Sequence, residues 1–128
     1  MLKKYSKTSD IVELAKDLVE TAENRRIEYD PEKSGFVDDT KWQELHRGQP
    51  ADQWDAAHVI SDNGFHCVIF RKSAFDKKRS QMDSLQFKIY VLETAIHEFF
   101  HVLGYRADAE IDEKTRDVLK KFMDIGAS

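Results

Sequence analysis

The chain has 128 residues, of which 41% are hydrophobic and 34% are charged, and its formal net charge at pH 7 is −4. This length suits one domain spanning residues 1–128, and the charge gives no argument for nucleic acid as a partner. Cys67 is the single cysteine, which excludes an intramolecular disulfide and favours the cytoplasm. No apolar stretch is long enough to span a membrane, and the basic N-terminus lacks the apolar region of a signal peptide, so neither is expected.

The first predicted element is a helix over residues 10–24. Asp10 can cap its N-terminus, and Glu13 at the third helical position completes a capping box. Apolar residues recur along this segment at helical spacing, so we expect a packing role without chemistry. They are Ile11, Leu14, Ala15, Leu18, Val19 and Ala22.

The region after this helix gives weaker signals. Ile27 and Tyr29 indicate an extended segment that stops at the following Asp-Pro pair. Asp39 or Thr40 can then cap a short helix that ends at Gly48.

A hairpin is predicted over residues 57–71. Two runs of β-branched and aromatic residues flank Asn63-Gly64, the dipeptide typical of a two-residue type I′ turn. Such a loop pairs Ile60 with Cys67 across the two strands.

Two histidines, His58 and His66, lie in these strands. In the predicted register their side chains fall on opposite faces of the sheet, so they cannot join one site. We therefore expect structural roles for both.

Residues 71–79 are rich in lysine and arginine. We interpret them as a solvated loop. The alternative is a basic rim that favours an acidic substrate or phosphate.

Apolar residues between positions 85 and 103 recur every three or four residues, which predicts a mostly buried helix capped by Asp83 or Ser84. Its polar face carries His97 and His101. After the next glycine, a second apolar stripe predicts a closing helix to about residue 124. The apolar stripe of the helix predicted between positions 85 and 103 consists of Leu85, Ile89, Leu92, Ile96, Phe99 and Leu103.

Residues 97–101 have the sequence HEFFH. On a helix, His97 and His101 lie on one face about one turn apart, so their imidazoles can bind a single tetrahedral Zn²⁺. Glu98 can reach a water on that metal. The pattern predicts one zinc ion per chain.

With Gly104 the stretch becomes HExxHxxG, which resembles the zincin metallopeptidases and, through the added glycine, their metzincin branch. The resemblance covers residues 92–112. It implies a zinc-dependent peptidase that hydrolyses a peptide or protein substrate with a metal-bound water activated by Glu98. It also implies that a strand before the metal helix pairs with extended substrate, and residues 65–70 are the candidate.

A catalytic zinc site needs a third protein ligand. In the metzincin branch it would follow the glycine by three positions, where this chain has Ala107. Asp108, Glu110, Asp112 and Glu113 compete for the place. Asp108 ranks first because it lies nearest that position, although it can also cap the closing helix, and Glu110 or Glu113 is the alternative.

Two further residues are candidates for supporting roles. Tyr105 follows the helix end and is a possible oxyanion donor. Glu93 lies one turn before His97 and could orient an imidazole that binds the metal, without contacting the metal itself.

Two other functions remain open. The pattern formed by His97, His101, Gly104 and Tyr105 is also similar to YbeY-type metal-dependent endoribonucleases, although their third histidine is absent here. The third possibility is a zinc-binding protein without catalysis on a zincin scaffold. The predicted fold is α+β, with a short antiparallel sheet containing the 57–71 hairpin packed on a central metal-binding helix.

Overall fold

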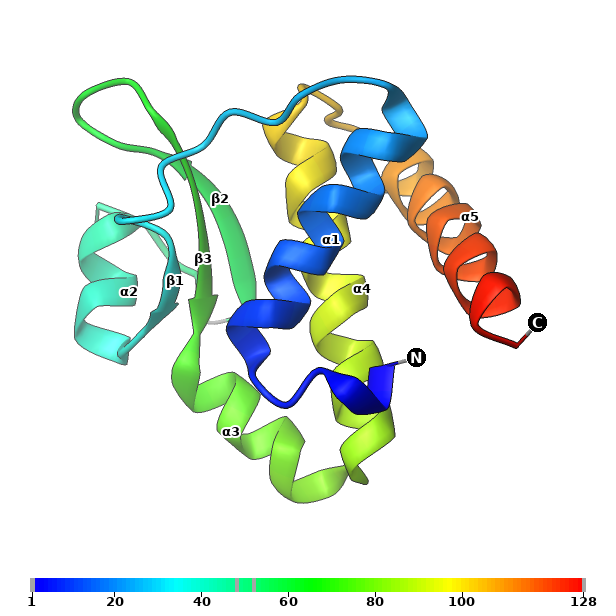
Figure 1. Cartoon of the computed structure of the whole chain (residues 1–128). Coiled ribbons are helices and arrows are strands. Elements are labelled where there is room, and N and C mark those ends of the chain that lie inside the picture. The colour runs from blue at the N-terminus through cyan, green and yellow to red at the C-terminus, as the bar shows by residue number, and fades with distance from the viewer. Residues whose placement is uncertain (1, 48, 52, 128) are drawn as a thin grey trace.

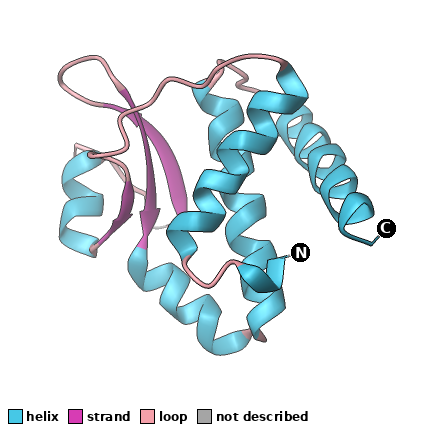
Figure 2. Cartoon of the chain, in the orientation of Figure 1, coloured by secondary structure: helices cyan, strands magenta, loops and turns pink. Residues whose placement is uncertain are grey.

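The computed structural model describes residues 2–47, 49–51 and 53–127, and its fold is α+β as predicted (Figures 1 and 2). None of the described helices has the length and apolar character needed to cross a membrane. In chain order the elements are η1 (Leu2–Lys4), α1 (Thr8–Glu23), β1 (Gly35–Val37), α2 (Asp39–Leu45), β2 (Ala56–Ile60), β3 (His66–Arg71), α3 (Lys72–Gln81), α4 (Ser84–Val102) and α5 (Asp108–Ala127).

The elements form three layers, with α2 on one face of the sheet and α1 and α4 on the other (Figure 1). On the α4 face, the side chains of Val68 and Phe70 join the main core. On the α2 face, Ile69 packs with the fully buried Trp42. Because successive strand residues point to opposite faces, β3 contributes to both cores and lies at the centre of the sheet.

The sheet is mixed, so the prediction of an antiparallel sheet was only partly right. Within the described residues the strand order is β1-β3-β2, with β2 antiparallel and β1 parallel to β3. The short β1 was not predicted as a strand. It pairs Phe36 with Phe70, and the two rings stack with their centroids 5.0 Å apart. This long-range contact, rather than a local pattern, stabilises the strand.

The predicted hairpin exists, but its loop and register differ. Residues 61–65 connect the strands, and the amide of Ser61 donates to the carbonyl of Phe65 at 2.9 Å. The strand partner of Ile60 is His66 rather than Cys67. The pairing is therefore shifted by one residue, which moves every side chain of one strand to the other face relative to its partner strand.

The backbone of the turn explains this shift. A type I′ turn needs positive φ at both central residues, but only Gly64, with φ of +82°, adopts it here; Asn63 does not. The Gly64 amide instead donates to the Ser61 carbonyl at 2.9 Å, so Gly64 closes a β-turn as its last residue.

Helix α4 is the central element, as predicted. Asp83 caps it, and Gln86 completes a capping box by accepting from the Asp83 amide. Its apolar side is wrapped by α1, the sheet and α5. The fully buried side chains on α4 are Val91, Leu92, Ala95, Ile96, Phe99 and Phe100.

The basic segment forms helix α3, so the prediction of a loop there was wrong. Phe75 is buried, while the cationic groups of Lys78 and Arg79 lie over aromatic rings of α4. The aliphatic parts of such side chains can cover apolar surface while their charges stay in water. A helix with so little apolar periodicity depends on these tertiary contacts.

Three helix boundaries also differ from the prediction. Helix α1 begins at Thr8, so Asp10 lies in its first turn instead of capping it. The residue that caps α2 is Asp38, whose carboxylate accepts from the Lys41 amide. The closing helix α5 begins at Asp108 and continues to residue 127.

Candidate metal centre

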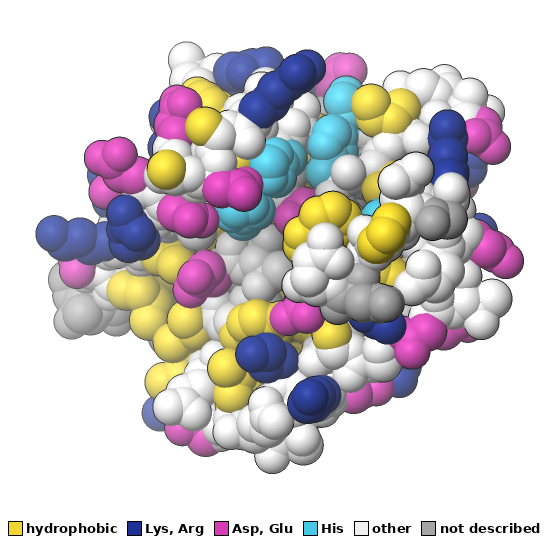
Figure 3. All heavy atoms as spheres, turned by 180° about the vertical axis from the view of Figure 1, so that it is seen from behind, with side chains coloured by type: hydrophobic (Ala, Val, Ile, Leu, Met, Phe, Trp, Pro, Cys, Tyr) yellow, Lys and Arg dark blue, Asp and Glu magenta, His cyan; other side chains and the backbone are white. Residues whose placement is uncertain are grey.

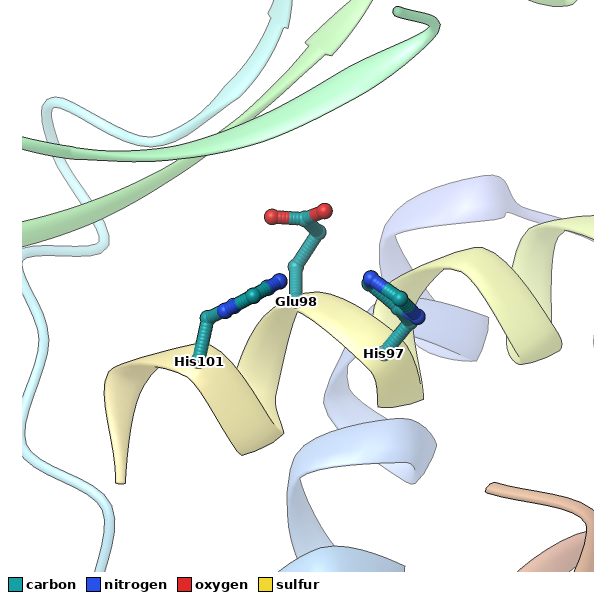
Figure 4. A group of neighbouring side chains, drawn as sticks. All are labelled: His97, Glu98 and His101. Atoms are coloured by element: carbon teal, nitrogen blue, oxygen red, sulfur yellow. The ribbon is translucent and has the colours of Figure 1, made fainter. Parts of the chain in front are cut away.

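His97 and His101 lie on one face of α4, with their ring centroids 4.9 Å apart. Glu98 extends between the two imidazoles toward the strands (Figure 4). One possible ligand atom from each residue lies within 4.8 Å of the others. This arrangement follows from helix geometry, because positions four apart are neighbours on the helix surface.

Asp108 reaches this group from the first turn of α5. Its Oδ1 atom lies 3.7 Å from Nε2 of His97 and 3.7 Å from Nε2 of His101. A tetrahedral ion with bonds of about 2.0–2.2 Å would hold such atoms roughly 3.3–3.5 Å apart. The Asp108 oxygen therefore needs to move only slightly toward each of the two nitrogens to reach that separation.

The structure does not bring the two alternative ligands to the site. Among the described carboxylates, those within 4.0 Å of a His97 or His101 ring nitrogen belong to Asp108 and Asp112. Glu110 and Glu113, the two alternatives, have exposed side chains on α5.

The second nitrogen of each imidazole faces an acceptor. Nδ1 of His101 lies 3.0 Å from the carbonyl oxygen of Tyr105, which can only accept, so Nδ1 carries a proton. In the neutral ring this leaves the Nε2 lone pair for a metal. Nδ1 of His97 lies 3.3 Å from Oδ1 of Asp112. Both rings are thus held in the orientation that ligand histidines commonly adopt.

Asp112, rather than Glu93, is the carboxylate that contacts the His97 ring and can orient it. Glu93 is exposed and makes no described ion pair with either histidine. Its spacing from His97 on one helix was a local signal. The contact of Asp112 depends on how α5 packs against α4, so no local pattern could have singled it out.

Burial changes the protonation of two residues in the site. It lowers the pKa of His97, and a charge on His101 lowers it further, while Asp112 and Asp108 oppose the change. Burial, with a smaller contribution from the charge of Asp108, raises the pKa of Glu98 to about 7. A neutral imidazole is the form that binds metals, and a carboxyl with this pKa exchanges protons near neutral pH.

Glu98 is also poorly satisfied within the protein. Its side chain is 7% exposed, and among the described groups Oε2 has no hydrogen-bond partner. A buried carboxylate oxygen without a partner is costly, so such groups are commonly found where water, an ion or a ligand binds.

A cavity of about 480 Å³ opens beside the site. Its walls come from α4, the start of β2 and the first turns of α5, and histidine side chains gather on the face seen in Figure 3. The size lies within the range of small-ligand sites. Its described lining includes His97, Glu98, Tyr90, Thr94, Glu93, Trp54, Asp55, Ala56, Asp112, Thr115 and Arg116.

Tyr105 does not line this cavity. Its hydroxyl donates to Glu23 on α1, and its ring packs on Phe100 with a centroid distance of 5.7 Å. The tyrosine at the cavity is Tyr90, whose hydroxyl donates to Oδ2 of Asp55 at 2.5 Å. Tyr90 lies two turns before His97 on the same helix face, a helical spacing that could have identified it.

Comparisons of the chain with models of protein families, with curated proteins and with solved structures found no match. Within the described residues, His97, Glu98 and His101 form a group that could hold a metal ion.

Proposed function

We propose that this protein is a zinc-dependent peptidase in which His97, His101 and Asp108 hold the metal and Glu98 is the general base. The observation that carries the proposal is the position of Asp108 Oδ1, 3.7 Å from the Nε2 atoms of both histidines. Two imidazoles and one carboxylate are a common donor set for catalytic zinc, and they leave a coordination position open.

Zinc in such a site acts as a Lewis acid and supplies a water of lowered pKa. Glu98 takes the proton from the attacking water and later delivers it to the leaving amine. Its pKa of about 7, raised mainly by burial, suits both transfers. The unpartnered Oε2 atom is available to accept the proton.

Strand β2 is better suited than β3 to pair with an extended substrate. The sequence pointed to residues 65–70, but β3 lies between two neighbours and both of its edges are used. In the described part of the sheet, β2 pairs on one side only, and Ala56 at its start lines the cavity. Main-chain hydrogen bonds to β2 would carry a peptide past Glu98.

The charges around the cavity argue against RNA as the substrate. Its described lining carries four carboxylates and one guanidinium, and carboxylates repel a phosphate backbone. Three of the four basic residues of α3 have partners: Lys72 pairs with Asp76, and Lys78 and Arg79 cover aromatic rings. The charged lining residues are Asp55, Glu93, Glu98, Asp112 and Arg116.

The test incubates the zinc-loaded full chain with a mixed-sequence peptide library and, in parallel, with structured RNA. We expect peptide cleavage that a chelator stops and that zinc restores. The Glu98→Gln variant should keep one equivalent of zinc and lose cleavage. RNA cleavage alone would favour the endoribonuclease, and bound zinc without any cleavage would favour a binding protein; either result would overturn the peptidase.

A further inference from the structure

A second pair of histidines lies on the sheet. Nε2 of His58 on β2 and Nδ1 of His66 on β3 are 2.7 Å apart, and the rings stack with an interplanar angle of 24°. Both side chains are half-buried. Nitrogen atoms this close share one proton in a hydrogen bond.

The strand register creates this pair. His58 lies opposite Val68 and His66 lies opposite Ile60, so the two histidines are diagonal neighbours on one face. The prediction that they cannot meet was wrong because it assumed a register one residue away. Ala56, two residues before His58 on the same face, lines the cavity beside the α4 site.

We propose that His58 and His66 form a second transition-metal site, in which the ion takes the place of the shared proton, that proton moves to the other nitrogen of its own ring, and water completes the coordination. A tetrahedral ion would need these nitrogens roughly 3.3 Å apart, an increase of about 0.6 Å that side-chain rotation can supply. Imidazole donors favour late first-row ions such as Zn²⁺ and Cu²⁺.

One further feature of the pair agrees with a ligand role. Half-exposure leaves room for water on the outer side of the rings.

The pair is separate from the α4 site. His58 and His66 are not members of the group formed by His97, Glu98 and His101, whose ligand atoms all lie within 4.8 Å of one another. The α4 site also has a carboxylate of its own in Asp108. A two-histidine site should bind more weakly than one with three protein ligands, so it should fill second. This inference does not require the protein to be a peptidase.

The test counts metal ions by equilibrium dialysis of the full chain against ZnSO₄, with CoCl₂ as a spectroscopic probe. The wild type should bind two equivalents, the weaker of which is lost in His58→Gln/His66→Gln. The His97→Ala/His101→Ala variant should keep one equivalent. His46→Gln removes a histidine outside both groups and should keep two.

The variants separate this inference from the proposed function. One equivalent in the wild type and none in His97→Ala/His101→Ala would overturn the second site and leave the first intact. Loss of all zinc from folded His58→Gln/His66→Gln would instead show that the α4 site does not bind zinc by itself. If a double variant does not fold, Co²⁺ added to the wild type decides: the second equivalent should broaden the ring-proton resonances of His58 and His66, and unbroadened resonances would contradict the proposal.

Discussion

Nδ1 of His97 on α4 lies 3.3 Å from Oδ1 of Asp112 on α5. The contact joins the helix that carries both histidines to the helix that carries Asp108. The contact positions the His97 ring. Because Asp108 lies one turn before Asp112 on α5, the same contact also helps to position the Asp108 carboxylate. The closing helix is therefore part of the candidate metal centre as well as of the core.

Replacing Asp112 should weaken zinc binding without unfolding the protein. Loss of a group that orients a ligand histidine typically lowers metal affinity by about 10–100-fold, and we expect that range for Asp112→Ala. The affinity can be measured by competition with a chromophoric chelator. Asp117→Ala, at an exposed position later on α5, is the control and should leave affinity unchanged. Equal affinities in the two variants would contradict the orienting role.

Replacing Asp108 should have a larger effect, because the carboxylate is proposed as a direct ligand. We expect Asp108→Ala to lower zinc affinity by at least about 100-fold, beyond the usual effect of an outer group. Glu110→Ala and Glu113→Ala should stay within about twofold of the wild type, since neither side chain contacts a histidine. The same chelator competition measures all three. A large loss in Glu113→Ala instead would move the third ligand to that residue.

The metal-free protein should become less stable as pH rises toward neutrality. Burial raises the pKa of Glu98 from 4.5 to about 7 in the folded state. The unfolded chain therefore ionises first: the contribution of Glu98 is fully present below pH 4.5 and is lost by about pH 7. At about 1.4 kcal/mol per pKa unit, the wild type should lose about 3 kcal/mol relative to Glu98→Gln.

Urea unfolding in the presence of a chelator, at several pH values between 4 and 8, measures this difference. Subtracting the Glu98→Gln curve removes the titration of all other groups. Parallel curves for the two proteins would show that the folded-state pKa of Glu98 is not raised.

The core around α4 should be sensitive to truncation. Phe99 is fully buried, and its ring meets Tyr29 edge-on with a centroid distance of 5.3 Å. Phe99→Ala should lower the free energy of unfolding by about 3–5 kcal/mol through lost burial and a new cavity. Phe65→Ala makes the same chemical change at a side chain that is 56% exposed, and should cost less than about 0.5 kcal/mol. Similar losses in both variants would contradict the assigned core.

The sequence alone determined the features that arise within one helix. The apolar stripe and the cap at Asp83 predicted α4, and the four-residue spacing placed His97 and His101 on its polar face. These predictions rest on the 3.6-residue repeat, which is set by backbone geometry and needs no distant partner.

Only the tertiary structure decided which segments meet. Sheet side chains alternate with a period of two, so a shift of one residue in the hairpin separates or joins His58 and His66. That register is selected by burial: Val68 faces the α4 core while Val59 packs under α2. The contact of Asp112 with His97 likewise depends on how two helices pack, because long-range packing energies carry no local sequence signal.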